Sequence, residues 1–212
     1  MLRFAPSPTG RLHVGNARVA ILNYLFAKKN KLKFILRIDD TDKNRSKESF
    51  IKLIQEDLKW LGIQYDSTFN QSNRMKKYYE ICEILKKKGK LYPCYETPEE
   101  LELKRKIQLK TGKPPIYDRS SLKFSKKDIF EYDRLGRKPH WRLLLDDDPI
   151  HWVDLIHKDI NFEKLSISDP VLVRSDNTPL FTITSVVDDI DFNISHILRG
   201  DDHLTNLSLI HI

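Results

Sequence analysis

The 212-residue sequence has little cysteine and no long hydrophobic run. Cys82 and Cys94 are its two cysteines, too few for a disulfide framework, so we expect free thiols in a cytoplasmic protein. No run of about 18 apolar residues occurs, which argues against a membrane-spanning helix. Motif residues begin at once after the first methionine, so we expect no signal peptide.

The composition is that of a basic globular protein. Hydrophobic residues make up 40% of the chain and charged residues 32%, which is enough apolar material for a core. The net charge of +7 favours a polyanionic partner such as RNA. A lysine-rich composition also arises from an AT-rich genome, so the charge alone leaves RNA binding open.

The first ninety residues alternate between strand-like and helix-like segments. Apolar runs at 2–5, 33–38 and 91–96 are typical of strands, and amphipathic segments at 16–28, 46–62 and 72–90 are typical of helices. Such alternation predicts a parallel sheet with crossover helices.

The pattern changes after Cys94. Thr97, Pro98 and Glu100 form a predicted capping box at the start of a helix, and a second, charged helix is expected over 126–137. Short alternating segments follow, which suggests an inserted subdomain. A strand–helix–strand pattern then returns, with strands expected at 171–175 and 195–200.

The stretch RFAPSPTGRLHVGNAR, which begins at Arg3, forms a polar turn between the first strand and the first helix. A turn at this edge of a parallel sheet, followed by a helix N-terminus, suits phosphate binding. Gly10 and Gly15 would allow close backbone approach, and His13 would donate to a phosphoryl oxygen. The alternative is a capped turn with an incidental histidine. The stretch is neither a dinucleotide fingerprint nor a Walker A loop.

Several motifs in order resemble one family. PSPTGRLHVGNAR is similar to the HIGH signature of class I aminoacyl-tRNA synthetases, in the form used by the glutamyl and glutaminyl enzymes. The resemblance covers residues 2–206, and the order and spacing are similar to those of bacterial glutamyl-tRNA synthetases. It continues through RIDDTDKNRS, WLGIQYD, QSNRMKKYYE, PCYETPEELELKRKIQLKTGKPPIYDR, SDPVLVRSD, SVVDDIDF and ILRGDDHLTN.

The resemblance implies an α/β fold with a Rossmann-like parallel sheet, interrupted by an inserted α+β subdomain that binds the tRNA acceptor stem. We expect the first half of the catalytic domain at 1–92, the insertion at 93–180 and the start of the second half at 181–206. Residues 207–212 (LSLIHI) fit the family poorly and are interpreted as non-native read-through. The family's lysine loop and anticodon-binding domains lie further downstream, so we expect a C-terminally truncated chain that is inactive by itself.

The family's reaction joins glutamate and ATP, supplied with Mg²⁺, into glutamyl-adenylate and then transfers glutamate to the 3′ end of tRNA(Glu). The resemblance implies these substrates and a monomer. Three alternatives stay open: a glutamyl-queuosine tRNA(Asp) synthetase, a glutaminyl-type enzyme, and a non-catalytic tRNA-binding module derived from a synthetase.

The resemblance also implies a glutamate-binding set. Arg3 would hold the side-chain carboxylate, which suits a planar guanidinium, and Asp39 would hold the α-ammonium. Asp39 is one methylene shorter than the glutamate usual there, and Phe181 replaces a usual tyrosine. The expected glutamate-binding residues are Arg3, Ser7, Asp39, Phe181, Ser185 and Arg199.

The expected catalytic residues of the opening turn are His13, Gly15 and Asn16. The implied ATP-binding residues are Pro6, Ser7, Pro8, Thr9, Gly10, His13, Gly15, Asn16 and Asp202.

Two further features are judged not to be sites. The segment KFSKK, Lys123–Lys127, looks like the family's lysine loop but lies in the insertion, so we interpret it as a solvated helix entry. Some relatives hold zinc through a C-x-C pair and a later cysteine. Here Glu96 stands where the second cysteine of such a pair would be, and the later segment YDRSS has no cysteine, so we predict no zinc or other resident metal.

Overall fold

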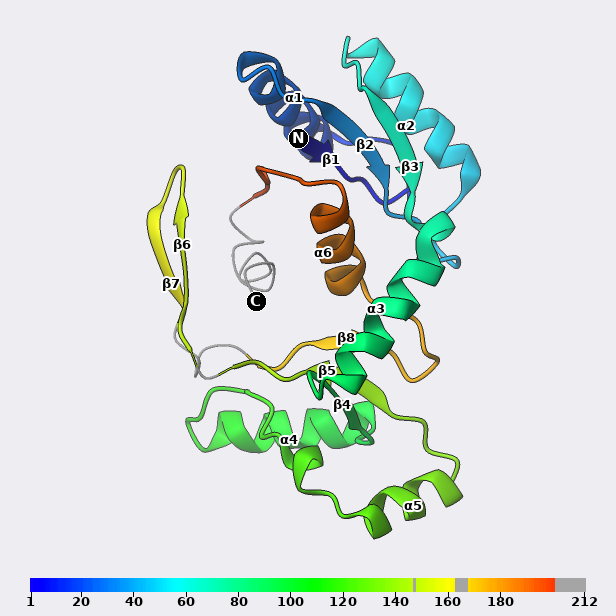
Figure 1. Cartoon of the computed structure of the whole chain (residues 1–212), viewed down its shortest axis with the longest axis vertical. Coiled ribbons are helices and arrows are strands. Elements are labelled where there is room, and N and C mark those ends of the chain that lie inside the picture. The colour runs from blue at the N-terminus through cyan, green and yellow to red at the C-terminus, as the bar shows by residue number, and fades with distance from the viewer. Residues whose placement is uncertain (147, 163–167, 201–212) are drawn as a thin grey trace. The chain divides into compact units, whose positions relative to one another are not determined.

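The computed structural model describes residues 1–146, 148–162 and 168–200 (Figure 1). Within them the chain forms two compact units. Within these ranges, the first unit contains Met1–Tyr78 and residues 184–200, and the second contains the described residues of Tyr79–Ile183.

The first unit contains the expected parallel sheet. Its strands are β1 (Leu2–Phe4), β2 (Phe34–Ile38) and β3 (Ser67–Asn70), hydrogen-bonded in that order. Helices α1 (Val14–Lys29) and α2 (Glu48–Trp60) connect the parallel strands, which confirms the predicted crossovers. The sequence analysis missed β3, because its four side chains are exposed or half-buried and give little apolar signal.

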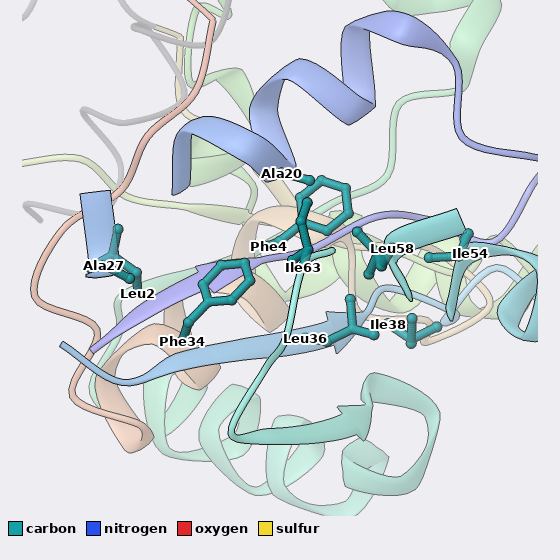
Figure 2. Packing of buried hydrophobic residues seen from close by; sticks show 10 residues of the cluster. All are labelled: Leu2, Phe4, Ala20, Ala27, Phe34, Leu36, Ile38, Ile54, Leu58 and Ile63. Carbon is teal, nitrogen blue, oxygen red and sulfur yellow. The ribbon is translucent and has the colours of Figure 1, made fainter. Parts of the chain in front are cut away.

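A hydrophobic core joins this sheet to its two helices. Side chains from β1, β2, α1 and α2 gather with Ile63 in one cluster (Figure 2). All five residues of β2 are buried, as expected for a strand covered on both faces. Burying one large aliphatic or aromatic side chain stabilises the fold by about 1.5–3 kcal/mol. The cluster contains Leu2, Phe4, Ala20, Ala27, Phe34, Leu36, Ile38, Ile54, Leu58 and Ile63.

Two further helices carry residues that matter below. The 3-10 helix η1 (Gln71–Arg74) leads directly into α3 (Met75–Lys87), and α6 (Phe181–Asp191) follows a loop later in the chain. The boundary between the two units falls inside both α3 and α6.

The second unit has an antiparallel sheet, which corrects one expectation. The segment around β4 (Leu91–Cys94) was expected to continue the parallel pattern, but β4 pairs antiparallel with β5 (His140–Leu143), and β5 pairs antiparallel with β8 (Val171–Val173). Strand composition carries no information on direction, and the partners of β4 lie far downstream in the sequence. Strands β6 (Ile150–Asp154) and β7 (Lys158–Phe162) form a separate hairpin.

Two helices of the second unit begin as their sequences predict. The capping box at Thr97 and Glu100 is present at the start of α4 (Pro98–Lys110). The charged helix is α5 (Lys126–Arg134), which is shorter than predicted and has its own capping box at Ser125. The short 3-10 helix η2 (Ser120–Lys123) lies between them.

The strand expected at 195–200 was wrong. This segment is irregular, and it is tied to the first unit by isolated hydrogen bonds from Ser195 N to the Met1 carbonyl and from Asn23 Nδ2 to the Leu198 carbonyl. Leu198 packs against the hydrophobic core, and the segment does not extend a ladder. Residues 201–212, with Asp202 and the LSLIHI segment, lie outside the described residues. No helix among the described residues combines the length and apolarity needed to cross a membrane.

Candidate active site

The turn after β1 is fixed to the chain that follows β2. The Pro6 carbonyl accepts a 3.0 Å hydrogen bond from Asp39 N, and the Pro8 carbonyl accepts one of 3.1 Å from Lys47 N. Pro6 and Pro8 are buried, whereas Ser7 and Thr9 between and after them are exposed. The prolines therefore anchor the loop, and the residues between them face outward at the carboxyl edge of the sheet.

His13 caps the N-terminus of α1. Its Nδ1 accepts a 3.1 Å hydrogen bond from Gly15 N, so Nδ1 is unprotonated and the neutral ring carries its proton on Nε2. The side chain is exposed, which leaves Nε2–H at the protein surface as a donor. This cap orients the imidazole over the first turn of the helix.

Glycine at position 15 leaves room for the imidazole ring. A Cβ on Gly15 would lie 2.9 Å from His13 Cε1 and 3.0 Å from Nδ1, so the imidazole ring would have to move. A Cβ on Gly10 would meet nothing within 4 Å in the described chain, so the absence of a side chain at Gly10 leaves open space in the loop. Asn16 is half-buried in the first turn.

The start of α1 is suited to an anion. Its first-turn N–H groups and the positive end of the helix dipole lie beside the outward-facing loop. The first turn carries no acidic side chain that would compete for them.

A network of buried ion pairs lies in the same unit. We call it the arginine–aspartate cluster and define it as Arg3, Arg37, Arg74, Asp39, Asp188 and Asp189. Five of these side chains are at most 5% exposed, and Arg74 is 23% exposed. They come from β1, β2, the residue after β2, η1 and α6, so the cluster connects the sheet to α6.

Arg3 binds Asp189 through one edge of its guanidinium. Arg3 Nε lies 2.6 Å from Asp189 Oδ1, and Arg3 Nη2 lies 2.8 Å from Oδ2. This bidentate pair fixes the plane of the guanidinium and uses two of its five N–H donors.

Arg37 is the centre of the cluster. It donates to both oxygens of Asp39 at 2.6 and 3.2 Å, to Asp189 Oδ1 at 3.1 Å and to Ser185 Oγ at 2.9 Å. Burial acts to lower the pKa of Arg37, but Asp39, Asp189 and Asp188 outweigh it and raise the pKa above its usual range. Burial raises the pKa of Asp39, opposed by Arg37 and Arg3.

Asp188 anchors α6 to η1 and α3. Its carboxylate accepts hydrogen bonds from Gln71 Nε2 at 2.8 Å, Arg74 Nε at 2.8 Å and Tyr78 OH at 2.9 Å. Arg74 Nη2 donates a 2.6 Å hydrogen bond to Asp191 Oδ2. Arg37 Nη1 also lies 3.8 Å from Asp188 Oδ2, so Asp188 shares Arg37 with Asp189 but has Gln71, Arg74 and Tyr78 as partners of its own.

Arg199 lies within electrostatic reach of the cluster. It is half-buried, and burial followed by the charge of Arg3 lowers its pKa, whereas Asp39 and Asp189 act to raise it. The structure thus brings together four of the residues expected to bind glutamate: Arg3, Asp39, Ser185 and Arg199.

The other expected residues have different places. Phe181 is half-buried at the first position of α6, one helical turn before Ser185, and belongs to the second unit. Ser7 is in the exposed loop, and Asp202 is outside the described residues. Asp40, next to Asp39, accepts hydrogen bonds from Ser72 N and Oγ at the start of η1 and therefore acts as a structural cap.

The segment KFSKK is a solvated helix entry, as predicted. Its Ser125 Oγ accepts from Asp128 N and caps α5, and the lysines around it are exposed.

The second unit has a hydrogen-bond network beside Cys94. The Glu96 carboxylate accepts from Tyr117 OH at 2.8 Å, Ser120 Oγ at 2.8 Å and Ser121 Oγ at 2.7 Å. Across residues 1–146, 148–162 and 168–200, no three histidine, cysteine or acidic side chains gather as a metal site would require.

Sequence reasoning missed Arg37, Asp188 and Asp189. Arg37 stands inside the apolar run FILRI, and a charge buried there needs a partner. The two aspartates follow Val187 in VVDD and give the same signal. Apart from Asp39, two residues after Arg37, their charged partners are more than 110 residues away in sequence, so the signal showed that partners exist without identifying them.

Comparisons with known proteins identify the family. Residues 1–211 match the family model of the catalytic domain of class I tRNA synthetases (E and Q). The chain is 54% identical over 207 residues to glutamate–tRNA ligase 1 of Rickettsia prowazekii and 52% identical to glutamate–tRNA ligase 2 of Rickettsia canadensis. Each match covers 98% of this chain and 46% of the relative, so the chain spans less than half the length of these relatives.

Solved structures agree in fold. A glutamate tRNA ligase from Elizabethkingia meningosepticum, solved in complex with its amino acid, has a TM-score of 0.87 at 30% identity, over 99% of this chain and 45% of that one. A glutamate–tRNA synthetase from Elizabethkingia anophelis has a TM-score of 0.88 at 30% identity, over 99% of this chain and 46% of that one. The parallel sheet, the capped turn at His13 and the matched family model together show that this chain belongs to the class I tRNA synthetases of the glutamate and glutamine type and carries sequence of their catalytic domain.

Proposed function

We propose that the full-length protein containing this chain is a glutamate–tRNA ligase. It would activate L-glutamate with ATP and Mg²⁺ and transfer it to the 3′ end of tRNA(Glu), as a cytoplasmic monomer. The names of the relatives support this proposal, because they are glutamate–tRNA ligases that match 98% of the chain.

The observation that carries the proposal is the burial of Arg3 and Asp39 in the arginine–aspartate cluster, with Arg199 within electrostatic reach of both. Glutamate has two carboxylates and one ammonium. Guanidinium groups bind carboxylates bidentately, and a carboxylate binds an ammonium. Arg3 keeps three N–H donors beyond those used by Asp189, and we assign it to the side-chain carboxylate.

The remaining glutamate contacts follow the same assignment. Asp39 would hold the α-ammonium, and Arg199 would face the substrate. Ser7 and Ser185 would add polar contacts, and Phe181 would line the pocket as an apolar wall.

The opening turn would bind ATP through residues 6–10 and the start of α1. In the first step, a glutamate α-carboxylate oxygen attacks the α-phosphorus; the new P–O bond forms as the bond to pyrophosphate breaks. His13 would donate from Nε2–H to a phosphoryl oxygen as charge builds up, with Gly15 and Asn16 at the helix start. Mg²⁺ would enter bound to ATP and would neutralise phosphate charge, and Asp202 would lie near the nucleotide.

In the second step, a hydroxyl of the terminal tRNA ribose attacks the activated carbonyl, and AMP leaves. We propose that residues 93–180 bind the acceptor end of the tRNA, between catalytic segments at 1–92 and 181–206. The net charge of +7 favours such a partner and predicts salt-dependent binding.

The test is ATP–pyrophosphate exchange by the full-length protein, with glutamate or glutamine and with or without tRNA. We expect exchange with glutamate and charging of tRNA(Glu). Exchange with glutamine alone would indicate a glutaminyl-type enzyme, and glutamate transfer only to tRNA(Asp) would indicate the queuosine-type enzyme. No exchange in any combination, with tRNA binding retained, would indicate a binding module.

A further inference from the structure

We propose that Asp189 is a positioning residue that locks the guanidinium groups of Arg3 and Arg37 together and thereby sets the preference of the site for an acidic amino-acid side chain. This inference rests on the proposed function and deepens it.

One carboxylate holds both arginines. Asp189 Oδ1 accepts from Arg3 Nε at 2.6 Å and from Arg37 Nη1 at 3.1 Å, while Oδ2 accepts from Arg3 Nη2 at 2.8 Å. All three side chains are at most 5% exposed, so water does not compete for these bonds. Without the carboxylate, two buried guanidinium groups would face each other across a gap.

Arg37 connects the two ends of the proposed substrate site. Arg37 is bound to Asp189 on one side and to both oxygens of Asp39 on the other. A continuous series of bonds therefore runs from Arg3, assigned to the side-chain carboxylate, to Asp39, assigned to the α-ammonium. This series fixes the distance between the two groups that would select glutamate by its length and charge.

Two physical effects of Asp189 have opposite signs, which makes the proposal testable. Its negative charge beside Arg3 weakens the attraction of the empty site for an anionic substrate. Its bidentate geometry strengthens binding, because Arg3 loses less conformational freedom when the substrate arrives. If charge were the main effect, removing it would lower the KM for glutamate; the proposal requires the KM to rise.

The matched pair of variants is Asp189→Asn and Asp191→Asn in the full-length protein. Both make the same chemical change in α6, but Asp191 is at the exposed edge and pairs with Arg74 and Lys77. Kinetics of ATP–pyrophosphate exchange, run with tRNA, separate the KM for glutamate, the KM for ATP and kcat. Thermal unfolding followed by circular dichroism measures the integrity of each variant.

For Asp189→Asn, we expect the KM for glutamate to rise about tenfold or more, kcat to change by less than about threefold, and the preference for glutamate over glutamine to fall. The KM for ATP stays unchanged, and Asp191→Asn behaves as wild type. An unchanged or lower KM for glutamate in a folded Asp189→Asn variant would overturn the proposal.

A second variant keeps the proposal testable if Asp189→Asn does not fold. Asp189→Glu keeps the charge and moves the carboxylate by one methylene, so we expect a raised KM here as well. If Asp189→Asn does not fold, an unchanged KM in Asp189→Glu overturns the proposal. Failure of the proposed function would give a different result, because the wild-type protein itself would then show no exchange with glutamate.

Discussion

At the scale of single residues, the first prediction concerns the contact between His13 and Gly15. Gly15→Ala would push the imidazole away, because the new Cβ would lie 2.9 Å from the ring. The cap bond from Gly15 N is then lost, and Nε2–H no longer points in a fixed direction. We expect kcat for amino-acid activation to fall about tenfold or more.

A double-mutant cycle measures whether this effect passes through His13. Gly15→Ala, His13→Ala and the double variant are compared by ATP–pyrophosphate exchange in the full-length protein. We expect Gly15→Ala to cost little once His13 is absent, since residues that act as one unit are not additive. Full additivity would show that Gly15 acts independently of the ring.

The second residue-scale prediction concerns Tyr78. Its buried hydroxyl donates to Asp188, and burial, followed by the charge of Asp188, raises the pKa of Tyr78 above its usual range. Tyr78→Phe removes a charge-assisted hydrogen bond and should lower the free energy of unfolding by about 1–3 kcal/mol. Urea unfolding measures it. The neighbouring Tyr79→Phe is the control, because Tyr79 is 40% exposed, and an equal loss there would refute the assignment.

At the scale of elements, the third prediction concerns the capping box at the N-terminus of α5. Ser125 Oγ accepts from Asp128 N, and Asp128 accepts from Ser125 N in return. Ser125→Ala should destabilise the protein by about 1 kcal/mol through loss of the cap. Ser49→Ala is the same change at the exposed second residue of α2, a helix without a side-chain cap, where alanine is the better helix former. Thermal unfolding should therefore move in opposite directions for the two variants.

Elements with local signals were predictable from sequence, and elements defined by distant partners were not. Thr97 with Glu100 marks the start of α4 within four residues, and the prediction of this helix was confirmed. The direction of β4 depends on β5, which begins at His140, and no local pattern encodes it. The segment 195–200 has strand-like composition but packs without a ladder. Composition alone does not distinguish these two outcomes.

The candidate site shows the same division. The turn around His13 was predictable because a histidine, two glycines and two prolines occur within ten residues. Arg37 and Asp189 were not assigned to the site, because their contact spans 152 positions. Long-range ion pairs of this kind are decided by the packing of α6 on the sheet.

At the scale of the whole molecule, acid stability should depend on Glu96. Burial acts to raise its pKa, but hydrogen bonds from Ser121, Ser120 and Tyr117 outweigh this and lower the pKa to about 2. A depressed carboxyl pKa stabilises the folded state above the ordinary pKa of 4.5, and this stabilisation is lost as the pH falls toward 2. We therefore expect Tm to fall as the pH is lowered from about 5 to about 3.

The variant Glu96→Gln tests this origin. It should have a lower Tm than wild type at pH 7 and a smaller decrease on acidification, because its side chain does not titrate. Glu102→Gln, an exposed position of α4, should follow the wild-type curve. A Glu96→Gln curve parallel to wild type would assign the acid sensitivity to other carboxylates.

The charge balance of the arginine–aspartate cluster has a consequence for how substrate choice can change. Three guanidinium groups face three carboxylates. Replacing any one by a neutral residue strands an opposite charge in the interior, which is costly. A variant that carries out the proposed reaction with an uncharged amino acid, at the stability of the wild type, would therefore need to replace an arginine and an aspartate together.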